Sequence, residues 1–126
     1  MEYVQNAAAG TAPLTPLRPC ATHTLHYRCK LLVVGGGSGG CTIAAKFARR
    51  LQKDAVIVLE PSDVHYYQPL WTLVAAGVTS VASTRRSARS VLPSQARWLR
   101  DSASSVDPAR QAVVTTNGTS STMNTS

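Results

Sequence analysis

A cluster of glycines follows a short apolar run in this sequence and has a spacing that suits phosphate binding. Gly35, Gly37 and Gly40 form the pattern G-x-G-x-x-G. In such a loop the first glycine allows a sharp turn, the second lets a pyrophosphate approach the backbone, and the third lets a helix pack close to a strand. The helix that follows offers unpaired N–H groups and a partial positive charge to an anion. The segment therefore predicts dinucleotide binding, with a glycine-rich turn that binds no ligand as the alternative.

An acidic residue lies where a dinucleotide would need one. Glu60 comes about 20 residues after Gly40, at the end of a second apolar run. Its carboxylate can accept hydrogen bonds from the ribose hydroxyls, and it repels a 2′-phosphate, which disfavours NADP. The motif alone does not distinguish FAD from NAD.

The elements that must position these residues have readable patterns. Residues 31–34 and 55–59 are apolar throughout, as in strands buried on both faces. Between them Ile43, Phe47, Ala48 and Leu51 recur at helical spacing. Strand, helix and strand within about thirty residues predict a right-handed βαβ unit with parallel strands. The fold class is therefore expected to be α/β.

The second half of the chain has weaker patterns. Residues 79–90 are expected to form a polar loop or a frayed helix, and residues 97–106 a strand. The turn residues Asp107 and Pro108 and the β-branched run at 111–116 predict a β-hairpin with that strand.

Composition limits the possible classes of protein. The chain has 126 residues, a length that fits one domain at most. Its net charge is +7, and only 15% of its residues are charged. Its three cysteines show no C-x-x-C spacing, so we expect neither a disulfide scaffold nor a metal site. No apolar run reaches the roughly 18 residues that span a bilayer. Residues 1–27 read as a disordered leader, either a mitochondrial transit peptide or an untargeted tail, residues 28–117 as the folded unit, and residues 118–126 as a low-complexity tail.

The stretch that follows Glu60 gives the sequence a specific resemblance. Residues 65–77 include Tyr-Gln-Pro-Leu-Trp-Thr-Leu-Val, which is far more specific than a glycine motif. Read with His26, Tyr27, the glycine loop, residues 91–94 and Trp98, it resembles the N-terminal part of mitochondrial sulfide:quinone oxidoreductase. The resemblance extends over roughly residues 26–116.

The resemblance implies an FAD-dependent flavoprotein of the disulfide-reductase superfamily, of which this chain would be an incomplete Rossmann-like FAD-binding unit. Such enzymes take electrons from sulfide through a cysteine pair and pass them through FAD to membrane quinone, at the mitochondrial inner membrane as peripheral proteins. The pyrophosphate of FAD would be cradled by Gly35, Gly37, Ser38, Gly39 and Gly40. Glu60 would hold the ribose, Gln68 would lie in a loop that reaches FAD, and Ala103 would place its backbone near the adenine.

The chain also departs from the family. The redox cysteines, the second dinucleotide-like domain and the membrane-associating helices would lie beyond Ser126, so we expect an N-terminal fragment with no catalytic residue and no activity of its own. The alternatives are a non-catalytic dinucleotide-binding fragment and a type II NADH:quinone oxidoreductase. The Tyr-Gln-Pro-Leu-Trp stretch favours sulfide over NADH.

Three other features allow more than one interpretation. Cys41, at the start of the helix, is either a thiol of lowered pKa or a small buried residue. His65 either contacts a ligand or is a surface or turn residue. The arginine-rich segment indicates a solvated face or an anionic membrane surface, and we expect no nucleic-acid partner because only Trp98 interrupts it. Its members are Arg85, Arg86, Arg89, Arg97 and Arg100.

Overall fold

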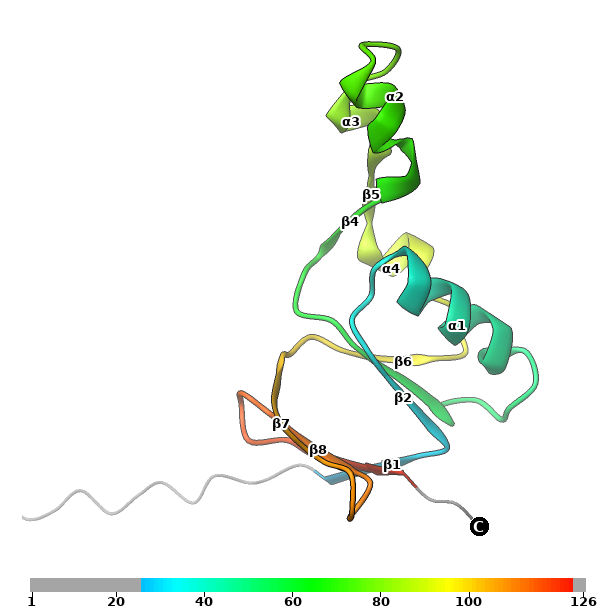
Figure 1. Ribbon diagram of the computed structural model, residues 1–126. Coiled ribbons are helices and arrows are strands. Elements are labelled where there is room, and N and C mark those ends of the chain that lie inside the picture. The colour runs from blue at the N-terminus through cyan, green and yellow to red at the C-terminus, as the bar shows by residue number, and fades with distance from the viewer. Residues whose placement is uncertain (1–25, 124–126) are drawn as a thin grey trace, which may run out of the picture.

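The computed structural model describes residues 26–123, and it has the mixed α/β character that the sequence predicts. In chain order the elements are β1 (His26–Cys29), β2 (Leu31–Val34), α1 (Ser38–Ala48), β3 (Val56–Leu59), β4 (Val64–Tyr66), the 3-10 helix η1 (Gln68–Leu70), α2 (Trp71–Ala75), α3 (Val81–Thr84), β5 (Arg85–Ser87), α4 (Ala88–Val91), β6 (Arg97–Leu99), β7 (Ala103–Asp107), β8 (Ala112–Thr115) and β9 (Ser120–Met123). Figure 1 shows that α1 covers the sheet that contains β2.

The predicted βαβ unit is present. Strands β2 and β3 pair in parallel, with Leu31 opposite Val56 and Val34 opposite Leu59, and α1 connects them. Every residue of β3 is buried, which agrees with its unbroken apolar sequence.

The buried face of α1 agrees in part with the predicted one, since Ala48 is buried and Leu51 packs against the core. Ile43 and Phe47 are 44% and 37% exposed, whereas the small residues Cys41, Ala44 and Ala48 are buried. The residues of α1 that pack on the strands are thus mostly small, which suits a close approach of helix and sheet.

The segment predicted as one strand at 97–106 is two strands in two different sheets. Strand β6 pairs in parallel with β3 and gives a three-stranded parallel sheet, while β7 belongs to a second sheet. The chain changes direction at Asp101, whose carboxylate accepts the backbone N–H of Ser102 at 2.8 Å. Such local side-chain bonding competes with a continuous strand.

The second sheet has the order β1-β9-β8-β7 and contains the predicted hairpin, in which β7 and β8 are antiparallel. The expected low-complexity tail at 118–126 is wrong for its first part. Residues 120–123 form β9, between β8 and β1, and Ser121 is 1% exposed. A strand with partners on both sides is held by backbone hydrogen bonds, so it needs no large apolar side chains.

The expected leader at 1–27 also ends too late, because His26 and Tyr27 already belong to β1. The rest of the leader, and its interpretation as a transit peptide, lies outside the described residues.

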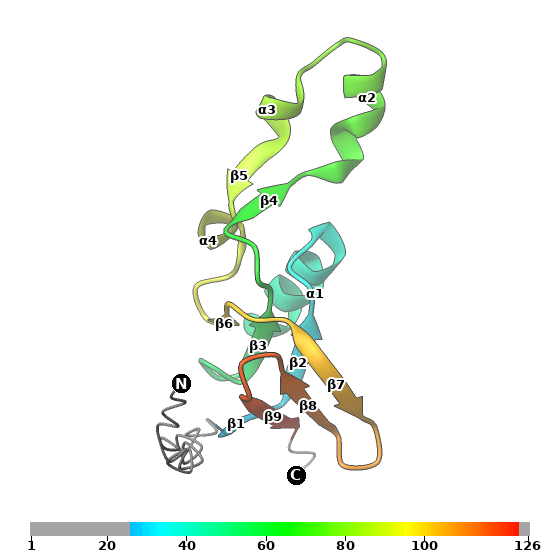
Figure 2. The ribbon, with the colours of Figure 1, turned by 90° about the vertical axis from the view of Figure 1, so that its left-hand side faces the viewer.

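The segment predicted as a polar loop or frayed helix at 79–90 contains α3, β5 and α4. Strand β5 pairs antiparallel with β4, and this ribbon carries η1, α2 and α3 away from the rest of the described chain (Figures 1 and 2). We call residues 64–87 the arm. Several of its large apolar side chains are exposed, among them Trp71 at 46% and Val78 at 71%. Within residues 26–123 no helix has the length and apolarity that a membrane span requires.

Candidate functional site

The glycine loop lies between the end of β2 and the start of α1, and its glycines have distinct roles. Gly35 has a φ of 97°, a left-handed conformation that favours glycine. An ideal Cβ at Gly40 would lie 1.9 Å from the carbonyl oxygen of Gly35, so α1 can approach the loop only because position 40 has no side chain. The same ideal atom at Gly37 would meet nothing within 4 Å. The loop is therefore tightly packed at its base and open at the first turn of the helix.

The open turn has donors without side-chain partners. Gly37 is the N-cap of α1 and gives no side-chain capping hydrogen bond, and no acidic residue lies in the first turn. The hydroxyl oxygen of Ser38 is buried and lacks a hydrogen-bond partner within the described chain. Gly39 has open space around it, as Gly37 has. An eleven-residue helix with an uncapped start and an unpaired hydroxyl group can bind an anion.

Glu60 closes the other side of the loop. One of its carboxylate oxygens accepts the N–H of Gly36 at 2.7 Å, and the other accepts the N–H of Ser62 at 2.7 Å. Each oxygen has a further lone pair with which it can accept a ribose hydroxyl. The indole of Trp98 donates to the backbone carbonyl of Glu60 at 2.8 Å, and the Glu60 N–H donates to Leu99 at 3.0 Å. Strand β6 thus fixes the backbone that carries this carboxylate.

Sequence reasoning missed the importance of Gly36, which occupies a variable position of the motif. An ideal Cβ there would lie 2.8 Å from Cγ of Glu60 and 2.9 Å from its Cβ, so no side chain fits without movement of Glu60. The carbonyl of Gly36 accepts the thiol of Cys41 at 3.1 Å and lies 3.1 Å from Nδ1 of His65. The run of three adjacent glycines was the signal that could have pointed to this residue.

Cys41 and His65 are both buried, at 7% and 6% exposure. Burial raises the pKa of the Cys41 thiol, and the negative charge of Glu60 raises it further. Of the two interpretations of Cys41, the structure supports the small packed residue and not the activated thiol. For His65 the surface interpretation is wrong, because the residue is buried at the base of the arm.

Within the described chain, no hydrogen bond joins Gln68 or Ala103 to the glycine loop. Gln68 is exposed at the start of η1 on the arm. Ala103 begins β7, opposite Thr115 and next to an irregularity in the ladder. Close to it is a cleft of about 340 Å³ whose walls include Tyr27, Trp98 and Asp101.

Asp101 is a further residue that sequence reasoning did not identify. Hydrogen bonds from the hydroxyls of Thr115 and Thr116, with those from the backbone of Ser102 and Asn117, lower the pKa of its carboxyl from 3.8 to about 2. The carboxylate joins the start of β7 to the end of β8. Its role within the described residues is to hold the hairpin in place.

The arginine-rich segment is divided by the fold. Arg97 forms an ion pair with Asp54 at 3.4 Å and lies over the ring of Tyr27. Arg100 forms an ion pair with Asp63 and lies over the ring of Trp98. The remaining three arginines lie on β5 and α4. In the part of the chain that the structure describes, no group of three His, Cys, Asp or Glu residues is placed to hold a metal ion.

Comparison with curated proteins gives a consistent result. The chain is 39% identical over 113 residues to the mitochondrial sulfide:quinone oxidoreductase of Mus musculus, covering 86% of this chain and 25% of the mouse protein. Proteins of the same name from Dictyostelium discoideum and Schizosaccharomyces pombe are 37% and 36% identical, each over 71% of this chain and over 20% and 23% of their own lengths. The chain thus spans about a quarter or less of these relatives. No protein-family model matches it.

Solved structures share the fold at low sequence identity. The sulfide:quinone oxidoreductase of Aquifex aeolicus superposes with a TM-score of 0.56 at 17% identity, over 80% of this chain and 23% of that one. A chain in the mitochondrial ATP synthase structure of Tetrahymena thermophila has a TM-score of 0.62 at 11% identity, over 86% and 25%. At these identities the likeness concerns the fold alone. The sequence comparisons identify the chain as a relative of the mitochondrial sulfide:quinone oxidoreductases that corresponds to the N-terminal quarter of such a protein, and the shared fold agrees with this.

Proposed function

We propose that this chain supplies the nucleotide-binding loop of an FAD-dependent sulfide:quinone oxidoreductase. The observation that carries the proposal is the position of Glu60, whose carboxylate bonds to the glycine loop at the uncapped start of α1. A carboxylate beside a glycine loop is what a ribose next to a pyrophosphate requires. The relatives named above support FAD as the dinucleotide, since their family is a flavoprotein family.

The residues around the loop fit this cofactor. The open space at Gly37 and Gly39 leaves room for a pyrophosphate, the unpaired hydroxyl of Ser38 can donate to it, and Gly35 and Gly40 keep the helix start in place. Glu60 retains the lone pairs that a ribose needs. We therefore assign the predicted Rossmann-like unit to the sheet β2-β3-β6 with α1, in an incomplete form. When bound, FAD would accept electrons from sulfide and pass them to quinone.

Two further contacts belong to the same proposal. Ala103 would offer its backbone to the adenine, near the cleft lined by Trp98 and Asp101. Gln68 would reach the cofactor from the arm. Both placements rest on the family resemblance, and neither residue bonds to the glycine loop in the described chain.

The names of the relatives extend the proposal to location and substrates. We propose that the protein acts in mitochondria, peripherally at the inner membrane, with sulfide and quinone as substrates of the whole enzyme. The part of the leader before His26 would serve as the transit peptide.

A second candidate, nucleotide binding without catalysis, is favoured by one observation. Both cysteines of the described chain, Cys29 and Cys41, are buried and free, and burial raises both pKa values. Neither cysteine therefore has the accessible, readily ionised thiol that a redox-active cysteine needs.

The decisive experiment is a titration of the purified 126-residue chain with FAD, followed by quenching of flavin fluorescence. Glu60→Gln should weaken binding about tenfold, because a carboxylate accepts charge-assisted hydrogen bonds that an amide does not replace. Asp107→Asn, which removes one charge from an exposed turn, is the matched control and should bind like the unaltered chain. If the chain binds ADP as tightly as FAD, the second candidate is favoured. If it binds neither, or binds NADP better, the proposal fails.

A further inference from the structure

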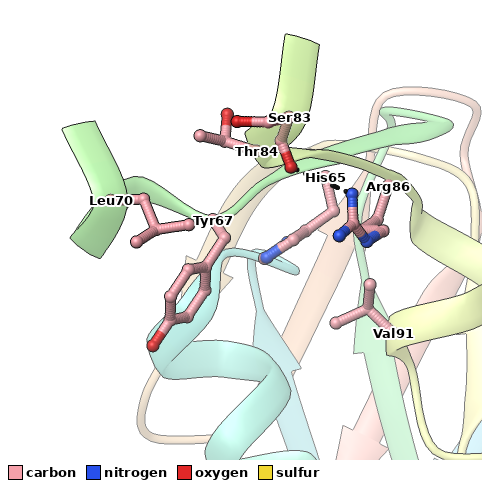
Figure 3. A pocket seen from close by; sticks show the side chains of 7 residues that line it. All are labelled: His65, Tyr67, Leu70, Ser83, Thr84, Arg86 and Val91. Atoms are coloured by element: carbon pink, nitrogen blue, oxygen red, sulfur yellow. Dashed lines mark hydrogen bonds between the residues drawn. The ribbon is translucent and has the colours of Figure 1, made fainter. Parts of the chain in front are cut away.

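His65 connects the arm to the glycine loop. It lies in β4, the residue is 6% exposed, and its Nδ1 is 3.1 Å from the carbonyl oxygen of Gly36, which lies 29 positions earlier in the chain. The ring also lines a cavity of about 250 Å³ at the base of the arm. Figure 3 shows His65 between Tyr67 on one side and Arg86 and Val91 on the other. The family resemblance assigns no role to this histidine.

The contact fixes the tautomer of the ring. A carbonyl oxygen only accepts hydrogen bonds, so the Nδ1 of His65 must carry a proton to bond to Gly36. In the neutral ring, Nε2 then has the free lone pair.

The bond also fixes the direction of the next amide. The C=O of Gly36 and the N–H of Gly37 belong to one planar trans peptide group, so they point in opposite directions. When His65 and Cys41 hold the carbonyl inward, the N–H of Gly37 must point outward, into the open side of the loop. Adjacent glycines have wide conformational freedom, and a clamp on one peptide removes part of it before a ligand arrives.

We propose that His65 is a positioning residue for the nucleotide site, which aims the Gly37 N–H at the pyrophosphate by holding the Gly36 carbonyl. The inference rests on the proposed FAD function and adds a residue from the arm to it. His65 itself touches the loop backbone and not the cofactor.

Two substitutions separate this role from simple packing. The side-chain amide of His65→Asn places its N–H near the position of Nδ1, whereas His65→Gln places it near that of Nε2. We expect His65→Asn to bind FAD within about twofold of the unaltered chain, and His65→Gln to bind about tenfold more weakly, as the loss of one buried hydrogen bond implies. Thermal unfolding of both variants checks that they fold. Equal FAD affinity in the two variants, whether high or low, would overturn the proposal.

A measurement without cofactor tests the geometry directly. In ¹⁵N-labelled chain, the two imidazole nitrogens of His65 should show a protonated Nδ1 and an unprotonated Nε2 when the ring is neutral. A proton on Nε2 instead would overturn the role of His65 even if FAD binds. Failure of the unaltered chain to bind FAD, with the Nδ1 proton present, would overturn the proposed cofactor and leave the clamp on Gly36 as a structural contact only.

Discussion

The carboxylate of Glu60 and the amide of Gly36 meet at 2.7 Å although 24 positions separate them in the chain. The same closeness leaves no space for a side chain at position 36. One contact between the ends of two neighbouring parallel strands thus determines both the position of the acid and the identity of the glycine.

Gly36→Ala should therefore displace Glu60. The new methyl would lie 2.8 Å from Cγ of Glu60, and overpacking of this kind costs about 1–3 kcal/mol of stability. Urea unfolding of the variant measures this loss. Gly39→Ala is the matched control, since its added methyl meets nothing within 4 Å and a helix tolerates alanine well. Equal midpoints for the two variants would show that Glu60 does not pack on Gly36.

Trp98→Phe should lower stability by about 1 kcal/mol, because it removes the indole donor that bonds to the Glu60 carbonyl at 2.8 Å. Trp71→Phe offers the same chemical change at a side chain that is 46% exposed on the arm. Differential scanning calorimetry of the two variants should give a lower melting temperature for the first only. A larger loss from the Trp71 variant would contradict the assigned hydrogen bond.

Asp101 should make stability depend on acid pH. Its pKa is lowered from 3.8 to about 2 in the folded chain, so its contribution to stability is complete above about pH 4. The contribution is lost as pH falls from about 4 through 2, because the unfolded chain then binds the proton more readily. A carboxyl ¹³C titration locates the folded pKa, and Asp101→Asn should remove this part of the pH dependence. A carboxyl that titrates near pH 4 in the folded chain would refute the hydrogen-bonded cluster.

Cys41 should resist alkylation in the folded chain. Burial, and then the charge of Glu60, raise its thiol pKa, so less of the reactive thiolate is present at neutral pH. Iodoacetamide labelling with mass spectrometry should modify Cys41 much more slowly in buffer than in urea. Rapid labelling in buffer at pH 7 would instead favour the activated thiol at a helix start.

Local patterns in the sequence were enough to predict the βαβ unit and the hairpin. The strands at Leu31–Val34 and Val56–Leu59 are apolar at every position, and a glycine loop between a strand and a helix has few structural solutions. The hairpin follows from turn chemistry at Asp107, whose carboxylate accepts the N–H of Arg110 at 3.0 Å.

Features that depend on distant partners were not predictable. Nothing in the composition of β9 indicates a strand, since its Ser and Thr residues are held there by β1 and β8. Ile43 fits the helical period, yet it is 44% exposed, while the smaller Ala44 is buried against the sheet. The burial of His65 likewise comes from a contact with Gly36, which no periodicity records.

The pairing of β1 with β9 brings the first and last described strands of the chain together in one sheet, in parallel register from His26 opposite Ser120 to Cys29 opposite Met123. This pairing limits how far the chain can be shortened from its N-terminal side without loss of a sheet partner. A cut before His26 spares the sheet, whereas a cut a few residues later removes the partner of β9 and exposes a serine-rich edge to solvent. The shortest N-terminal truncation that disturbs the second sheet is thus set by a strand near the other end of the described chain.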